Sequence, residues 1–206
     1  MRSKFSNQLK LLKNTRRKDP QTKESLTICQ EAIEKLPQVD KYDSLMGLEG
    51  IVAKTFFAAY YQDFEWNQRK PRLKCDAMNA SLDVGYTILF NFIEAFARMF
   101  GFDLYMGVYH RLWFKRKSLV CDLVEPFRCI IDQQTRKAWN LHQMKEEDFD
   151  VKKGEYRLKL EKNSDYCKLF YSAIIEHKKD IFKYIQSYYR CFMKSSNWNE
   201  YPTFEI

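Results

Sequence analysis

The chain has 206 residues, of which 35 are Lys or Arg and 27 are Asp or Glu, so its formal net charge is +8. This length suits one large domain, or one domain with an extension, and allows an ample core. The positive excess is spread along the chain, which argues against a disordered basic tail and favours a protein that lies against a polyanion.

Two further observations narrow the class of protein. The N-terminus has no apolar signal segment, and the most apolar window, 84–100, is interrupted by Asn91, Glu94 and Arg98. We therefore expect a buried helix there, no membrane span and a cytoplasmic protein. The six cysteines contain no Cys-x-x-Cys pair, which argues against a zinc ribbon or a disulfide framework and favours free thiols.

Six glycines and weak strand signals favour long helices. Apolar residues at helical spacing predict several of them. The expected helices lie around 9–12, with a break at Asp19-Pro20, and at about 25–36, 43–61, 76–100, 118–133, 164–177 and 180–193. Asp43-Ser44 and Asp76 or Asn79 are the expected caps of two of them, and Gly101 the expected end of the long one. We expect a charged linker at 145–153 and a short extended piece at 154–158.

The stretch 107–128 concentrates the chemistry. Ser118 is the expected N-cap of a helix on which Asp122 and Glu125, three residues apart, share one face. Pro126 should kink this helix between the two carboxylates. Two carboxylates with a neutral imidazole nearby, that of His110, can hold a divalent cation. An exposed acidic face beside an unrelated histidine is the alternative.

A third carboxylate, Glu49, lies between Gly47 and Gly50 in a predicted helix. Glycine destabilises a helix by about 0.5–1 kcal/mol relative to Ala. Close approach of another backbone, a metal or a nucleic acid would explain two glycines there. Alternatively, Glu49 only interacts favourably with the positive end of the helix.

Basic residues gather in three places. The cluster Lys13, Arg16, Arg17 and Lys18 is either a solvated face or a phosphate contact. The loop 66–74 and the segment after His110 supply cations that would neutralise phosphates without selecting bases. The residues expected to hold phosphates are Arg69, Lys70, Arg72, Arg111, Lys115, Arg116 and Lys117, and Arg128 is expected to pair with a nearby carboxylate.

Taken together, these segments resemble a known family. The run 45–50 (Leu-Met-Gly-Leu-Glu-Gly) is followed by Arg69 and Arg72, then 79–86, Gly101-Phe102-Asp103, 107–110 and 118–128. Their order and spacing over residues 41–206 resemble the CRISPR-associated spacer integrase/endonuclease, the catalytic subunit of CRISPR adaptation.

The resemblance implies an all-α fold, with a helical catalytic domain at 41–206 after a basic helical extension at 1–40. It implies that Glu49, His110 and Glu125 are metal ligands and that Asp122 supports catalysis beside them. The metal would be Mn²⁺ or Mg²⁺, and the nitrogen ligand favours Mn²⁺. The expected activity is insertion of short double-stranded DNA into a CRISPR repeat by 3′-hydroxyl transesterification, in a prokaryotic cytoplasm. Two strand transfers require a dimer or a higher assembly.

One departure from the family concerns the N-terminus. Family members commonly carry an N-terminal β-rich domain that contributes to dimerisation and to docking of a small ferredoxin-like subunit. Here about forty helical residues precede the Gly-Leu-Glu-Gly motif. The chain is therefore either a compact integrase or a domain of a longer protein. The starting Met favours the compact form, and the ferredoxin-like partner is in doubt. Two other functions remain open: a metal-dependent nuclease of branched DNA, and a non-catalytic DNA-binding scaffold.

Overall fold

The computed structural model describes residues 1–16, 19–64, 66 and 68–206. Arg17, Lys18 and Asn67, which belong to two of the predicted basic segments, lie outside the described residues. The α-helices are α1 (Arg2–Lys13), α2 (Pro20–Lys35), α3 (Tyr42–Tyr60), α4 (Ala77–Met99), α5 (Ser118–Val124), α6 (Arg128–Asn140), α7 (Asn163–Glu176) and α8 (Lys178–Met193). Short 3₁₀ helices lie at Leu36–Gln38, Glu125–Phe127 (η2), Glu146–Asp148, Leu160–Lys162 and Trp198–Glu200.

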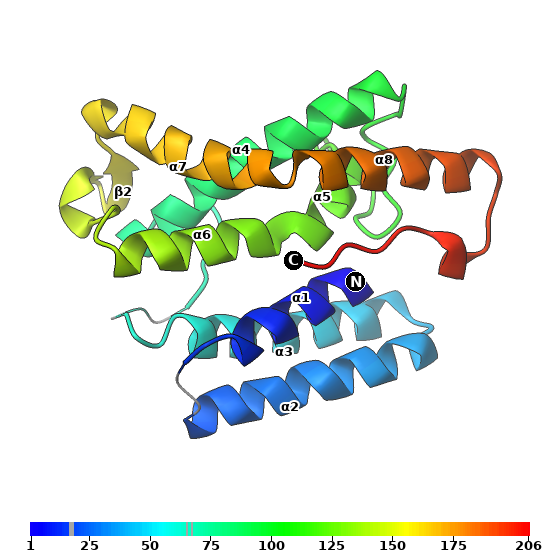
Figure 1. Cartoon of the computed structure of the whole chain (residues 1–206), viewed down its shortest axis with the longest axis horizontal. Coiled ribbons are helices and arrows are strands. Elements are labelled where there is room, and N and C mark those ends of the chain that lie inside the picture. Colours follow the sequence, from blue (N-terminus) through cyan, green and yellow to red (C-terminus); the bar gives the residue numbers. More distant parts are fainter. Residues whose placement is uncertain (17–18, 65, 67) are drawn as a thin grey trace.

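The helices form two packed groups (Figure 1). Helices α1, α2 and α3 pack on one another, and α4 packs on α5, α6, α7 and α8. Helix α1 joins the groups, because it also contacts α6 and η2. The C-terminal segment lies against α1: the Asn7 amide donates to the carbonyl of Phe204 at 3.0 Å, and the Ile206 N–H donates to Asn7 Oδ1 at 3.1 Å.

Local sequence explains several helix ends. The Asp76 carboxylate accepts the Asn79 N–H at 2.6 Å, which caps the start of α4, and Asp19 caps α2 in the same way, with Pro20 at its first position. Gly101, with φ of +75°, follows the end of α4, where its lack of a Cβ allows the left-handed backbone. The predicted cap at Asp43-Ser44 is wrong, since α3 begins at Tyr42 with Lys41 as its N-cap.

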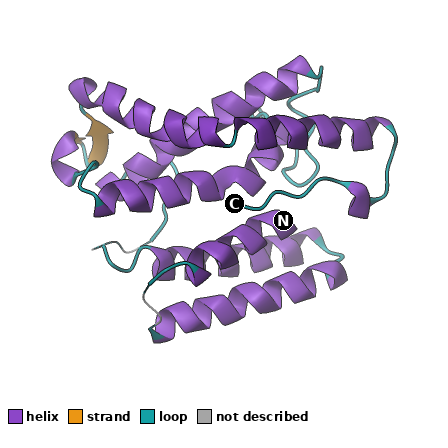
Figure 2. Cartoon of the chain, viewed as in Figure 1, coloured by secondary structure: helices purple, strands orange, loops and turns teal. Residues whose placement is uncertain are grey.

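Across the described residues, the all-α expectation holds except for one small sheet (Figure 2). Where a charged linker was expected, β1 (Phe149–Lys152) pairs antiparallel with β2 (Glu155–Leu158). The predicted extended piece at 154–158 is thus confirmed, and the prediction of a linker at 145–153 is wrong. Helix α6 also continues to Asn140, beyond the expected decay at 133–136, because Thr135 and Ala138 are buried on its inner face. No helix in the described ranges has both the length and the apolarity needed to cross a membrane.

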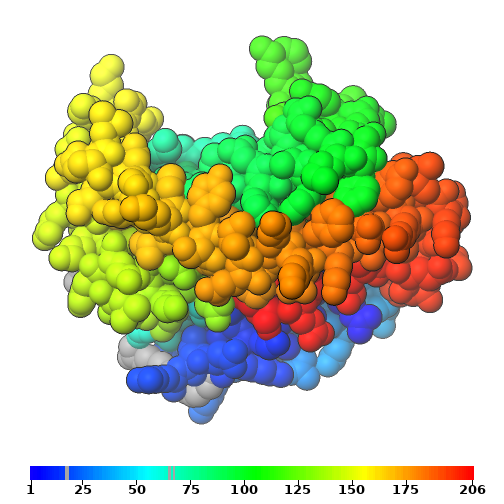
Figure 3. All heavy atoms as spheres, turned by 45° about the horizontal axis from the view of Figure 1, so that its top comes forward, coloured from blue at the N-terminus to red at the C-terminus, as the bar shows by residue number. Residues whose placement is uncertain are grey.

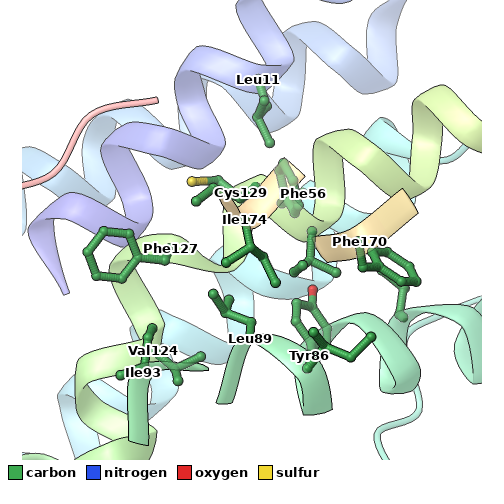
Figure 4. Packing of buried hydrophobic residues seen from close by; sticks show 14 of the residues in the cluster. Leu11, Phe56, Tyr86, Leu89, Ile93, Val124, Phe127, Cys129, Phe170 and Ile174 are labelled. Carbon is green, nitrogen blue, oxygen red and sulfur yellow. The ribbon is translucent and has the colours of Figure 1, made fainter. Parts of the chain in front are cut away.

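The core gathers around α4 (Figure 4). Leu89 and Ile93 of α4 are fully buried, and so are Phe127 of η2 and Phe170 and Ile174 of α7. Phe127 also packs on Phe204 of the C-terminal segment, with ring centroids 4.5 Å apart. The η2 turn is therefore held from both sides, which matters because it carries Glu125.

A buried carboxylate, Asp132 of α6, lies next to this core. Burial raises the pKa of Asp132 to about 6, although the hydrogen bond from Tyr86 and the Arg128 and Arg69 cations oppose the rise. The Tyr61 hydroxyl donates to the backbone carbonyl of Asp132 at 3.0 Å. Because the folded-state pKa exceeds the ordinary 3.8, this group's contribution to stability is present below that value and is lost as pH rises through about 6.

We expect Tyr86→Phe to destabilise the protein by about 1–3 kcal/mol at pH 8, because it removes a donor from a buried carboxylate. The loss should be smaller at pH 5, where Asp132 is mostly protonated. Chemical denaturation at the two pH values measures both effects. The exposed Tyr105 offers the control: Tyr105→Phe should change stability by less than about 0.5 kcal/mol, and equal losses in the two variants would contradict the prediction.

Candidate active site

The three predicted metal ligands line one cavity of about 540 Å³. They are Glu49 from α3, His110 from the loop between α4 and α5, and Glu125 from η2. Lys4, Arg69 and Arg128 also line it. Segments far apart in the sequence thus line a single cavity. The order of the motifs along the chain does not by itself reveal this proximity.

The kink predicted at Pro126 is confirmed. Helix α5 ends at Val124, the 3₁₀ turn η2 carries Glu125 to Phe127, and α6 begins at Arg128. Ser118 is not the N-cap. It is the first residue of α5, and its hydroxyl donates to the Arg111 carbonyl at 2.9 Å.

Asp122 does not line the cavity but bonds to the loop that carries His110. Its Oδ2 accepts the backbone N–H groups of Val108 and Tyr109, and its Oδ1 accepts that of His110 at 3.0 Å. The His110 ring nitrogen Nδ1 lies 2.6 Å from Oδ1. Gly107 permits this packing, because a Cβ there would lie 2.4 Å from the His110 carbonyl oxygen. The carboxylate therefore holds the imidazole by Nδ1 and leaves Nε2 as the nitrogen for other partners.

If His110 ligates the metal predicted from the sequence, Asp122→Asn should lower Mn²⁺ affinity by about 10–100-fold, the usual cost of losing a carboxylate that orients a ligating histidine. An amide cannot accept all the hydrogen bonds that Asp122 accepts. Isothermal titration calorimetry with Mn²⁺ measures the effect. Asp103→Asn in the same loop, where Oδ1 accepts only the Tyr105 N–H among the described contacts, should leave the affinity unchanged, and an unchanged Asp122→Asn would refute the orienting role.

Glu125 is buried and ionised. Burial alone would raise its pKa, but the Arg128 guanidinium and the Lys4 ammonium outweigh it and lower the pKa of Glu125 to about 2. Arg128 Nε donates to Glu125 Oε1 at 2.9 Å, which confirms the expected pairing of Arg128. The other oxygen, Oε2, lies 2.7 Å from Lys4 Nζ, but without the geometry of a hydrogen bond.

Glu49 shares this lysine. Its Oε1 accepts from Lys4 Nζ and its Oε2 accepts from the Tyr109 hydroxyl. Within the described ranges, no three His, Cys, Asp or Glu side chains are grouped closely enough to hold a metal ion. In this structure the ammonium of Lys4 lies between the two carboxylates instead. Sequence reasoning missed both Lys4 and Tyr109, because neither is linked to Glu49 by any local spacing.

No described segment packs closely against the glycines on either side of Glu49. A Cβ built on Gly47 or Gly50 has no described atom within 4 Å. The explanation by close approach of another backbone of this chain is therefore wrong. Gly50 lines the cavity, so the helix leaves open space beside the carboxylate.

The predicted phosphate-binding residues divide into two groups. Arg69 donates to Asp83 and Asn79, Lys117 lies 2.7 Å from Glu94, and Arg116 donates to the Arg111 carbonyl and to Ser118. Arg72, Arg111 and Lys115 are exposed, and the Arg111 guanidinium stacks 3.9 Å from the ring centroid of Tyr42. Lys70 is half-buried, and its backbone N–H donates to Asn79.

The loop between α4 and α5 carries an apolar group that sequence analysis did not consider. Leu112, Trp113 and Phe114 are 67%, 70% and 82% exposed. In Figure 3 this loop (green) and the region of the β1–β2 turn (yellow) form two projections with lower surface between them. Apolar and aromatic side chains thus lie next to the exposed cations of the same loop.

The geometry agrees with a known family. The family model described as CRISPR associated protein Cas1 matches residues 1–172. The chain belongs to the Cas1 family. The match begins before the resemblance noted at 41–206, so α1 and α2 are part of the Cas1 pattern. Over 123 residues the chain is 33% identical to CRISPR-associated endonuclease Cas1 1 of Thermodesulfovibrio yellowstonii, covering 57% of this chain and 39% of that protein.

Two solved structures share the Cas1 fold. One is a partial Cas6-RT-Cas1–Cas2 complex, with a TM-score of 0.90 at 21% identity over 99% of this chain and 66% of that chain. The other is a casposase bound to integration product, with a TM-score of 0.80 at 18% identity over 99% of this chain and 61% of that one. The chain spans between 39% and 55% of the length of three curated Cas1 relatives.

Proposed function

We propose that this chain is the catalytic part of a DNA integrase. It would join the 3′-hydroxyl ends of short double-stranded DNA to a CRISPR repeat by metal-dependent transesterification. The observation that carries the proposal is the convergence of Glu49, His110 and Glu125 on one cavity, with the His110 ring held by Asp122. The casposase neighbour, bound to an integration product, adds support from a protein of the same fold.

The chemistry of the three donors suits a divalent ion, although the described side chains are not grouped as closely as metal ligands would be. Two carboxylates and an imidazole suit Mn²⁺ or Mg²⁺, and the nitrogen favours Mn²⁺. The ammonium between Glu49 and Glu125 indicates that these carboxylates can share one positive charge. Glu125 Oε2 makes no hydrogen bond among the described residues, and the cation that it faces is the Lys4 ammonium, 2.7 Å away. We propose Glu49, His110 and Glu125 as the residues that would hold the metal.

The bound ion would neutralise the charge that builds on the phosphoryl oxygens as the 3′-hydroxyl attacks. The protein's own groups would orient and hold the metal-binding side chains. Asp122 keeps the imidazole in place by Nδ1, and Arg128 holds Glu125 by its bond to Oε1, whereas Lys4 contacts Oε2. Such fixed ligands lower the reorganisation needed when the substrate arrives.

The exposed cations near the site would bind the DNA backbone. Arg72, Arg111 and Lys115 are free to neutralise phosphates, whereas Arg69 and Lys117 already pair with carboxylates. The open face at Gly47 and Gly50 leaves room for a strand beside Glu49. Trp113 and Phe114 on the projecting loop suit stacking on unpaired bases near the reacting end.

We expect the double variant Trp113→Ala/Phe114→Ala to bind DNA with unpaired 3′ bases about tenfold or more weakly, because base–aromatic stacking contributes about 1–3 kcal/mol per base. Affinity for a blunt duplex should change less. Fluorescence anisotropy with the two DNAs measures the difference. The equally exposed Trp198 provides the control variant Trp198→Ala, and an equal loss on both DNAs would argue against stacking.

An integration assay tests the proposed function. It uses a labelled short duplex, a supercoiled plasmid with a CRISPR repeat, and Mn²⁺. Covalent transfer of the label that disappears when the 3′-hydroxyl is blocked would support integration. Metal-dependent cleavage that persists with the blocked end would favour the nuclease. DNA binding with no product under any condition would favour the scaffold. Size-exclusion chromatography with DNA tests the self-association that two strand transfers need, and a monomer alone would count against integration.

A further inference from the structure

Lys4 of α1 reaches into the predicted metal site and is the basic residue of α1 that lines its cavity. Its side chain is 10% exposed, and its ammonium contacts Glu49 Oε1 and Glu125 Oε2. No other described cation contacts both carboxylates. Arg128, the other basic neighbour of Glu125, bonds to Oε1 and leaves Oε2 to the lysine.

The helix that carries Lys4 is anchored close to it. One turn further along α1, the Asn7 amide donates to the carbonyls of Pro126 and Phe204, both at 3.0 Å. On the other side of Lys4, the Ser3 hydroxyl accepts the Phe204 N–H at 3.2 Å. The backbone of α1 is thereby fixed against η2. Movement of the ammonium must come from the flexible four-carbon side chain of Lys4.

Charge balance makes the ammonium and a divalent ion alternatives. Counting Glu49, Glu125, Lys4 and Arg128 alone, the cluster is neutral as it stands. A divalent ion added between the carboxylates would bring a net charge of +2 into a largely buried cavity, with the ammonium at contact distance from the metal. Like charges so close in a low-dielectric site repel strongly. Tyr109 and Arg128 bond to the other oxygens of the two carboxylates, so a metal would be left with the oxygens that Lys4 contacts, Glu49 Oε1 and Glu125 Oε2.

We propose that Lys4 is a built-in competitor of the catalytic metal: its ammonium and the divalent ion occupy the space between Glu49 and Glu125 in turn. Without metal, Lys4 neutralises the two carboxylates and keeps the site closed. Metal loading displaces the side chain of Lys4 toward solvent. This inference rests on the proposed function, because it assumes that Glu49 and Glu125 are metal ligands.

A labelling experiment tests the displacement on the unaltered chain. Lysines are acetylated briefly with and without saturating Mn²⁺, and the modification of each is measured by mass spectrometry. We expect Mn²⁺ to increase the labelling of Lys4 several-fold, while the exposed Lys10 of the same helix stays constant. Unchanged labelling of Lys4 at saturating Mn²⁺ would overturn the proposal.

Mn²⁺ affinity tests the competition. Calorimetry compares the wild type with Lys4→Gln, Lys4→Arg and the matched control Lys10→Gln. We expect Lys4→Gln to bind Mn²⁺ on the order of tenfold more tightly, because no cation has to be displaced, and the other two to stay near wild type. The Tm of Lys4→Gln without metal should fall, and Mn²⁺ should raise it by more than it raises the wild-type Tm.

The outcomes separate the two levels of inference. Mn²⁺ binding that is lost in Glu125→Gln but unchanged or weakened in Lys4→Gln would retain the metal site and overturn the competition. No Mn²⁺ binding by either the wild type or Lys4→Gln would overturn both the competition and the metal site of the proposed function. If Lys4→Gln does not fold, the labelling of the wild type decides.

Discussion

The variants Glu125→Gln and His110→Ala are expected to lose strand transfer by roughly a thousandfold or more each, since a bound metal supplies several kcal/mol of transition-state stabilisation. Each removes one of the three proposed ligands that converge on the cavity. Glutamine is close in size to glutamate but carries no charge, so the loss would report on ligation more than on packing. The integration assay with Mn²⁺ measures the rate.

The two variants differ in their expected effect on stability. A loss of strand transfer in both could therefore not be explained by unfolding alone. His110 is 24% exposed in its side chain, and its truncation should leave the fold nearly intact. Glu125 is buried against Arg128 and Lys4, so Glu125→Gln leaves two cations without full compensation and should lower the Tm. The exposed Glu31→Gln on α2 is the control. Strand transfer at the wild-type rate by His110→Ala would show that His110 is not a ligand of the catalytic metal.

Gly85→Val is expected to destabilise the fold by about 3 kcal/mol or more, at the upper end of overpacking costs. A Cβ on Gly85 would lie 2.5 Å from Ile131 Cγ2 and 2.7 Å from Phe170 Cε1. Both neighbours are fully buried and cannot withdraw. For a chain of this size the Tm should fall by roughly 6–12 °C, which differential scanning fluorimetry measures.

Gly47→Ala is the matched control, since it also replaces a helical glycine. No described atom lies within 4 Å of a Cβ at Gly47, so alanine should stabilise α3 by about 0.5–1 kcal/mol. The two substitutions are thus expected to act in opposite directions. A Tm for Gly85→Val equal to that of the wild type would show that α4 can move away from α6 and α7 without cost.

Glu49 and Lys4 show where local pattern ceases to be informative. The Gly-Leu-Glu-Gly run marks Glu49 as unusual within a helix, and both glycines turn out to face open space. Nothing around Lys4 sets it apart from the other basic residues of 1–16, yet only its ammonium enters the cavity between Glu49 and Glu125. The same limit applies to the basic loops, where Arg69 and Lys117 have the composition of phosphate-binding residues but pair with Asp83 and Glu94.

The sequence by itself determined the features that depend on neighbours along the chain. Apolar spacing predicted α4, α7 and α8. Asp76 or Asn79 was the predicted start of α4 and Gly101 its predicted end, and Pro126 predicted the break between Asp122 and Glu125. These follow from helical periodicity, capping and the missing proline N–H, all of which act within a few residues.

Only the tertiary structure decided what depends on distant contacts. Three features join segments whose separation along the chain gives no hint of their distance in space. They are the convergence of Glu49, His110 and Glu125, the Lys4 contacts with two carboxylates, and the hydrogen bonds that hold Asp122. The physical reason is that burial and charge pairing are settled by which faces the helices bury against one another. A cation such as Lys4 acquires its role only when that packing removes it from water and leaves it two carboxylates as partners.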